Sequence, residues 1–205
     1  MNLHRTLGTP DWETVDAASH NRFQKVAAAT RGVVSPANVI TVIGLTVVIF
    51  GLVAILNQQF LLGLGLLVAG RLLDVADGLV AELTKTKSPL GEIFDAAADK
   101  IGTLFTIIVL FVADISYWWV IAALLIPQAI IPLVIFYKKQ KGIGIHPTVA
   151  GKLSMAFTWV GIAGLLVAEA LDDVAAFTIA VYCVIGVSLV LGMYTLWQYA
   201  TGRDQ

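Results

Sequence analysis

The sequence predicts an all-α integral membrane protein with six transmembrane helices, and three observations support this. First, 58% of the 205 residues are hydrophobic and only 13% are charged, whereas soluble domains carry roughly 25% charged residues. Second, the mean hydropathy is +0.85. Third, the apolar residues gather in six runs, each near the ~20 residues that span a bilayer. The runs lie near 38–56, 60–82, 91–112, 117–136, 150–170 and 174–198.

The polar stretch 1–35 is expected to be a cytoplasmic N-terminal arm, followed by a six-helix transmembrane domain over 36–205. Pro10 and Asp11 have the pattern of a helix start, because an aspartate can cap free backbone N–H groups. Apolar and charged residues then alternate irregularly. This pattern fits either an amphipathic helix lying at the membrane surface or a solvated helix.

The long apolar runs favour helices over the strands of a membrane barrel, which would alternate apolar and polar residues. Cations in the loops predict how the helices are oriented. All Lys and Arg residues except Arg71 and Lys100 lie on one side of the membrane if the N-terminus is cytoplasmic. The positive-inside rule therefore places both termini in the cytoplasm, in an inner or plasma membrane.

Charged residues inside the second and third runs cluster beside the short loop that joins them. A charge at membrane depth is costly and marks a functional site by default. Asp74 and Asp77 are spaced i, i+3, and Asp95 and Asp99 are spaced i, i+4, so each pair lies on one helix face. Because the short loop makes the two helices antiparallel neighbours, we expect the four aspartates to share one pocket.

Four carboxylates in one pocket repel one another unless cations neutralise them. Hard divalent ions prefer oxygen ligands, and Mg²⁺ also bridges phosphates. The aspartates therefore indicate a metal–phosphate site near the membrane surface. Gly78 and Gly91 lie beside them and would leave room for a flat group against the backbone. The alternative is that these glycines pack helices together, like the other glycines of the runs.

The segment DVADGLVAELTKTKSPLGEIFDAAAD, residues 74–99, resembles the signature of the CDP-alcohol phosphatidyltransferase family, D-x2-D-G-x2-A-R-x8-G-x3-D-x3-D. The six-span layout with a cytoplasmic arm is also similar to that family. Within the family, we expect a phosphatidylglycerophosphate synthase on the ground of the acceptor alone. The fifth of the eight fixed positions, an arginine in the family, is Glu82 here. The other seven match in type and spacing: Asp74, Asp77, Gly78, Ala81, Gly91, Asp95 and Asp99.

The resemblance implies a phosphotransferase that moves a phosphatidyl group from CDP-diacylglycerol to a polar alcohol and releases CMP. It implies two Mg²⁺ or Mn²⁺ ions per site, and the general base would be Asp99. It further implies a homodimer, and the net charge of −1 gives no reason to expect a nucleic-acid partner. The implied metal ligands are Asp74, Asp77, Asp95 and Asp99, and the implied CDP-binding residues are Asp74, Asp77, Gly78, Ala81 and Gly91.

Glu82 reverses a charge that the family places near the nucleotide and its phosphates. Glu82 could pair with Lys85 or Lys87, one turn onward or across the turn. Arg71, one turn before Asp74, could supply the missing cation. Glu82 could instead contact the cytidine or a metal, or the chain could be an inactive relative.

The identity of the alcohol acceptor is predicted from how common each reaction is, not from particular residues. Glycerol 3-phosphate is the first choice because phosphatidylglycerol synthesis is widespread. Inositol phosphate is the second choice, and phosphatidylglycerol, as in cardiolipin synthesis, is the third. Candidate acceptor residues are Lys152, Arg31, Asn38 and Thr41; the alternatives are membrane anchoring for the cations and helix capping for the other two. Outside this class, an ion transporter also carries buried acids, but usually with internal repeats that this sequence lacks.

Overall fold

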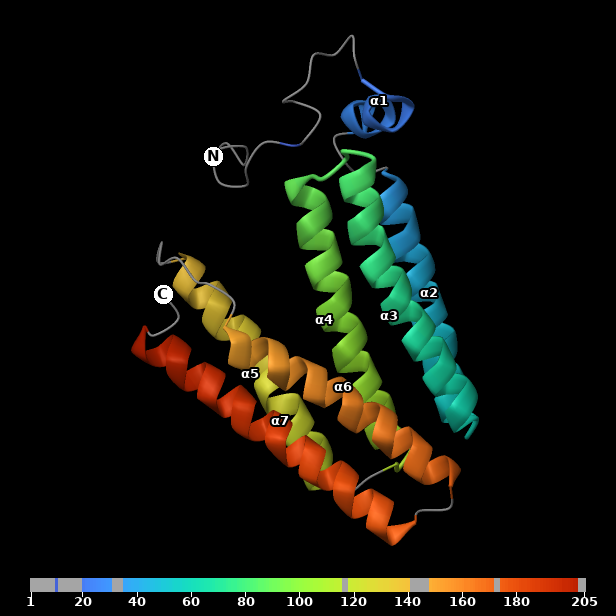
Figure 1. The fold of residues 1–205 in the computed structure, drawn as a ribbon, viewed down its shortest axis with the longest axis vertical. Coiled ribbons are helices and arrows are strands. Elements are labelled where there is room, and N and C mark those ends of the chain that lie inside the picture. Colours follow the sequence, from blue (N-terminus) through green and yellow to red (C-terminus); the bar gives the residue numbers. More distant parts are fainter. Residues whose placement is uncertain are drawn as a thin grey trace. The chain divides into compact units, whose positions relative to one another are not determined.

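The computed structural model describes residue 10 and residues 20–30, 35–115, 118–140, 148–171 and 174–202, with only the backbone described at 89–97, 100, 136 and 139. These residues form seven α-helices and no strand (Figure 1), which confirms the all-α prediction. The helices are α1 (Arg22–Ala29), α2 (Pro36–Leu56), α3 (Phe60–Leu83), α4 (Pro89–Val112), α5 (Trp118–Gln140), α6 (Val149–Ala170) and α7 (Ala175–Thr201).

Each of the six long helices coincides with one of the predicted apolar runs. In the part of the chain that the structure describes, four helices are long and apolar enough to cross a membrane: α2, α5, α6 and α7. Helices α3 and α4 have 24 residues each, about 36 Å at 1.5 Å per residue. Charged residues interrupt the apolar surface of α3. The chain is therefore an all-α membrane protein, and the count of six spans stays a prediction.

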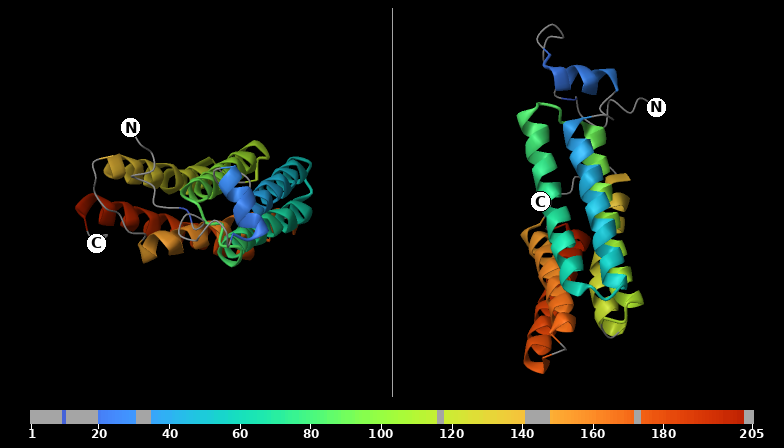
Figure 2. Two further views of the ribbon diagram at one scale, coloured as in Figure 1. Left: turned by 90° about the horizontal axis from the view of Figure 1, so that it is seen from above. Right: turned by 90° about the vertical axis from the view of Figure 1, so that its right-hand side faces the viewer.

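The chain forms two compact units, and the helices α2, α3 and α4 each contribute to both. The first unit comprises residues 1–53 and 65–102, and the second comprises residues 54–64 and 103–205. Within the first unit, α1 lies across the end of α3 beside the α3–α4 loop in both views (Figures 1 and 2). The predicted boundary after residue 35 stays a prediction.

Helix α1 begins with a capping box that also ties it to the α3–α4 loop. Asn21 Oδ1 accepts from the backbone N–H of Gln24 at 2.8 Å, and Gln24 Oε1 accepts from that of Asn21 at 2.9 Å. The same two amides donate to the loop carbonyls of Thr84, at 3.1 Å, and Lys85, at 3.4 Å. Of the predicted helix start, Pro10 is not helical and Asp11 lies outside the described residues.

Asn21→Ala is expected to loosen α1 without disturbing the transmembrane helices. The change removes the N-cap and the bond to Thr84, and losing an N-cap costs about 1 kcal/mol. Amide hydrogen exchange in α1 should quicken about fivefold, the equivalent of that free energy. Lys25→Ala is the matched control, because Lys25 is exposed on the same helix and takes no part in the cap. Equal exchange in the two variants would contradict the role of Asn21.

Small residues let α2 and α3 pack closely, as expected for helices in lipid. A Cβ added at Gly70 would lie 2.5 Å from Val48 Cγ2, and one added at Gly44 would lie 3.3 Å from Leu73 Cβ. In the second unit, Gly161 and Gly164 of α6 meet Ile185 and Val181 of α7 in the same way. These glycines are packing contacts.

A buried polar cluster joins α5, α6 and α7 in the second unit. Thr158 Oγ1 lies 2.7 Å from Ser188 Oγ, and Gln128 Nε2 donates to Thr158 Oγ1 at 3.2 Å. Ser154 Oγ donates to the backbone carbonyl of Ser188 at 2.9 Å. Interhelical hydrogen bonds of this kind hold membrane helices together where lipid provides no hydrophobic driving force.

Candidate active site

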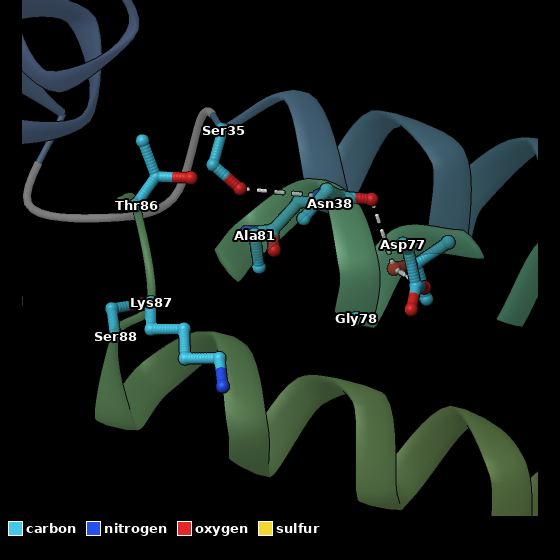
Figure 3. A pocket seen from close by; sticks show the side chains of 10 residues that line it. Ser35, Asn38, Asp77, Gly78, Ala81, Thr86, Lys87 and Ser88 are labelled. Carbon is cyan, nitrogen blue, oxygen red and sulfur yellow. Dashed lines mark hydrogen bonds between the residues drawn. The ribbon is translucent and has the colours of Figure 1, made fainter. Parts of the chain in front are cut away.

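A pocket of about 90 Å³ lies in the first unit, at the start of α2 and the end of α3 (Figure 3). The α3–α4 loop completes it. The pocket is small, and most of the residues that line it are polar, including one carboxylate and one ammonium group. Its lining residues are Ser35, Ala37, Asn38, Thr41, Asp77, Gly78, Ala81, Thr86, Lys87 and Ser88.

The start of α2 places two of these polar side chains. Ser35 caps the helix, because its Oγ accepts from the backbone N–H of Asn38 at 3.1 Å. Pro36 follows at the first helical position, where its missing N–H costs nothing. Asn38 and Thr41 are one turn apart and both line the pocket, as their spacing predicts. Ser35 provides the cap, so the alternative of helix-start capping does not explain Asn38.

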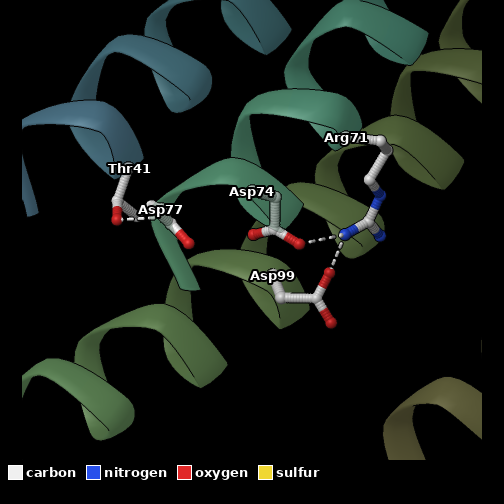
Figure 4. Close-up of polar contacts among 5 residues, drawn as sticks. All are labelled: Thr41, Arg71, Asp74, Asp77 and Asp99. Carbon is white, nitrogen blue, oxygen red and sulfur yellow. Dashed lines mark hydrogen bonds and ion pairs between the residues drawn. The ribbon is translucent and has the colours of Figure 1, made fainter. Parts of the chain in front are cut away.

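Asp77 is the carboxylate that lines the pocket, and only 3% of the residue is exposed. Its Oδ2 accepts a hydrogen bond from the Thr41 hydroxyl (Figure 4). A buried carboxylate is costly unless it is hydrogen-bonded and its charge is balanced. Among the residues whose side chains are described, no Lys or Arg forms an ion pair with Asp77. The arrangement therefore fits a cation bound beside this carboxylate.

Arg71 brings together two of the predicted aspartates from neighbouring helices. Its Nη1 atom forms an ion pair with Asp99 of α4 and lies 3.6 Å from Asp74 Oδ2 of α3 (Figure 4). All three side chains are partly buried. Arg71 does not line the pocket beside Asp77. The guanidinium therefore balances the charge of Asp74 and Asp99, and it leaves Asp77 to other partners.

The remaining predicted residues are placed as follows. The side chain of Asp95 and the position of Gly91 fall in the stretch of α4 where only the backbone is described, and Arg31 lies outside the described residues. Lys152 is exposed near the start of α6, in the second unit. The shared pocket of four aspartates thus stays a prediction, and the structure describes three of its members.

The described carboxylates have the right chemistry for a hard divalent cation, because Mg²⁺ and Mn²⁺ take oxygen ligands. Asp77 is buried and has a hydroxyl partner, and Asp74 lies one turn before it on α3. No three acidic, His or Cys side chains gather into a metal-binding group within the described part of the chain. The donor set fits the ion, and the side chain of Asp95 is the predicted further ligand.

The end of α3 turns the loop back toward the pocket. Thr86 N–H donates to Ala81 O at 3.0 Å and Lys85 N–H donates to Glu82 O at 3.1 Å. Lys85 has a φ of 53°, the left-handed conformation that ends many helices. These bonds bring Thr86, Lys87 and Ser88 to the pocket beside Ala81. The sequence analysis missed Ser35, Thr86 and Ser88, although a serine before Pro36 is a typical N-cap signal.

Glu82 pairs with Lys87 across this turn, with 3.7 Å between Oε2 and Nζ. The prediction that Glu82 could pair with Lys87 is confirmed. Arg71, the other candidate to replace the family arginine, is engaged by Asp74 and Asp99. Lys87 lines the pocket and Arg71 does not, so Lys87 is the cation of the described pocket.

Gly78 differs from the packing glycines of α2 and α3. No described atom lies within 4 Å of a Cβ added at Gly78, whereas an added Cβ at Gly70 meets Val48 at 2.5 Å. Gly78 also lines the pocket beside Asp77 and Ala81. Of the two interpretations of this glycine, the structure favours room for a bound group over helix packing.

A comparison with protein families gives one match that covers most of the chain. A family model described as CDP-alcohol phosphatidyltransferase matches residues 34–194. This range contains every lining residue of the pocket and the three described aspartates. No curated protein matches the chain.

Proposed function

The chain belongs to the CDP-alcohol phosphatidyltransferase family, and from this premise we propose that it transfers a phosphatidyl group from CDP-diacylglycerol to an alcohol, releasing CMP. The match over residues 34–194 carries the proposal. The pocket adds support, because Asp77, Gly78 and Ala81 of the signature line one cavity together with polar groups of α2 and the loop.

In the proposed complex, the cytidine lies against Gly78 and Ala81, where the helix surface is open. Asn38, Thr86 and Ser88 offer hydrogen-bonding groups around it. The lipid tails of CDP-diacylglycerol extend into the bilayer, which explains why the site is built from membrane helices. Gly91, on the backbone of α4, is a further proposed contact of the nucleotide.

Asp99 is the proposed general base. Its carboxylate takes the proton of the acceptor hydroxyl, and the oxygen attacks the phosphorus on the lipid side. The bond from that phosphorus to the CMP oxygen breaks, and CMP leaves with the electron pair. Arg71 contacts both Asp99 and Asp74 and so fixes the base relative to α3. Holding base, acceptor and phosphate in line supplies much of the rate enhancement.

The proposed metal ligands are Asp74, Asp77 and Asp95, with Asp99 adjoining them. Two Mg²⁺ or Mn²⁺ ions held there would neutralise the pyrophosphate and the charge that develops on CMP. Thr41 orients Asp77 through its hydroxyl. The buried position of Asp77, without a described cationic partner, supports this assignment.

The proposed acceptor is glycerol 3-phosphate, which would make the chain a phosphatidylglycerophosphate synthase. Inositol phosphate and phosphatidylglycerol are the alternatives within the family. Lys152 and Arg31 are the proposed cations for a phosphorylated acceptor. We also propose that the site and both termini face the cytoplasm, in keeping with the loop cations, and that the protein is a homodimer.

One assay tests the proposal. Purified full-length protein is mixed with CDP-diacylglycerol, Mg²⁺ and each acceptor in turn, and CMP release is measured. We expect CMP with one acceptor, loss of turnover when EDTA removes the divalent ion, and full recovery when Mg²⁺ is added back. If folded protein releases no CMP with any acceptor, the proposed phosphatidyltransferase activity is wrong. If turnover survives EDTA, the assignment of the aspartates as metal ligands is wrong.

A further inference from the structure

The pocket contains a cation at a position that the family signature does not specify. The signature has an arginine where this chain has Glu82, and Lys87 lies five residues farther, within the unspecified stretch of the motif. We infer that Lys87 binds the phosphates of the CDP-linked substrate in place of that arginine. This inference rests on the proposed function, because it takes a cytidine nucleotide as the occupant of the pocket.

The geometry of the loop supports this role. The left-handed turn at Lys85 reverses the chain after α3, so Lys87 lines the pocket together with Gly78 and Ala81. Figure 3 shows its side chain reaching back from the loop, with the ammonium on the side of the pocket away from Ser35 and Asn38. A nucleotide with its base near Asn38 would therefore direct its phosphates toward Lys87.

The pair with Glu82 places the ammonium of Lys87 within reach of the side chain at position 82. The ammonium lies 3.7 Å from the Glu82 carboxylate, so a cation carried on residue 82 would reach the region that Lys87 occupies. The side chains of Lys87 and Glu82 are 46% and 70% exposed. An exposed pair of this kind is held weakly, so the ammonium can move from Glu82 to a phosphate, with which it forms a charge-assisted hydrogen bond.

Neighbouring cations do not fit this role. Arg71 forms ion pairs with Asp74 and Asp99 and does not line the pocket. Lys85 is two residues from Lys87 in the same loop and is also exposed, but it does not line the pocket. Lys85 therefore provides a matched control of equal charge.

The test compares Lys87→Met with Lys85→Met in the full-length protein. Calorimetry with CDP in Mg²⁺ should show about tenfold weaker binding in Lys87→Met, the usual effect of losing one charge-assisted hydrogen bond. Lys85→Met should bind like the wild type. In the CMP-release assay, Lys87→Met should raise the KM for CDP-diacylglycerol by a similar factor and leave the KM for the acceptor unchanged. Adding Glu82→Arg to Lys87→Met should restore CDP binding to within about threefold of the wild type.

Three results would overturn the inference: equal CDP affinity in the two single variants, a raised KM for the acceptor alone, or no rescue by Glu82→Arg. Thermal melting of each variant shows whether a loss of binding reflects unfolding. The proposed function fails separately, if the wild type binds CDP yet releases no CMP with any acceptor. In that case the calorimetry still decides the role of Lys87.

Discussion

Asp99→Asn is expected to lower the rate of CMP release by about 100-fold or more, because general-base catalysis contributes at least that factor. Asparagine has the shape of aspartate but cannot accept the proton of the acceptor hydroxyl. Its side-chain oxygen can still accept from Arg71, whose Nη1 contacts Asp99 Oδ1 in the wild type. The variant should therefore keep its fold and its affinity for CDP-diacylglycerol.

The matched control for this change is Asp114→Asn. Asp114 is exposed in the turn after α4 and has a φ of 55°, a conformation that asparagine tolerates well. This control should show wild-type turnover. CMP release is measured at saturating substrate, and CDP-diacylglycerol binding is measured separately. If Asp99→Asn retains more than about a tenth of the turnover, the base lies elsewhere, because general-base catalysis typically contributes about 100-fold or more.

The helices could be predicted well because long, uniformly apolar runs favour helices over strands. Each apolar run approaches the ~20 residues that a span requires, and the helices coincide with these runs. The start of α1 was predicted less well, although its signal was in the sequence. Asn21 followed three residues later by Gln24 resembles a capping box. The bonds from these residues to Thr84 and Lys85 join parts of the chain about 60 residues apart, which local patterns cannot reveal.

The candidate site shows where helical periodicity stops being informative. Asp74 and Asp77 are three residues apart, so their directions differ by about 60° around the helix axis. That angle suffices for them to meet different neighbours. Asp77 bonds to Thr41 of α2, and Asp74 lies beside Arg71 near Asp99 of α4. Spacing placed both on one face, but only the packing of α2, α3 and α4 determined the partner of each.

Gly78→Leu is expected to weaken binding of CDP-diacylglycerol by at least tenfold and to lower CMP release accordingly. The new side chain would enter open space beside Asp77 and Ala81, because no described atom lies within 4 Å of an added Cβ. It would then occupy the place proposed for the cytidine. Replacing a helical glycine also removes about 0.5–1 kcal/mol of conformational cost, so thermal stability should not fall.

Gly65→Leu is the matched control, because Gly65 lies on the same helix, is exposed and also has no described atom within 4 Å of an added Cβ. It does not line the pocket. Both variants gain the same apolar side chain on α3, so any effect of added bulk or altered helix propensity is shared. A loss of binding confined to Gly78→Leu therefore reports a filled pocket. Equal binding in the two variants would show that the nucleotide does not approach α3 at Gly78, and the proposed cytidine site would be wrong.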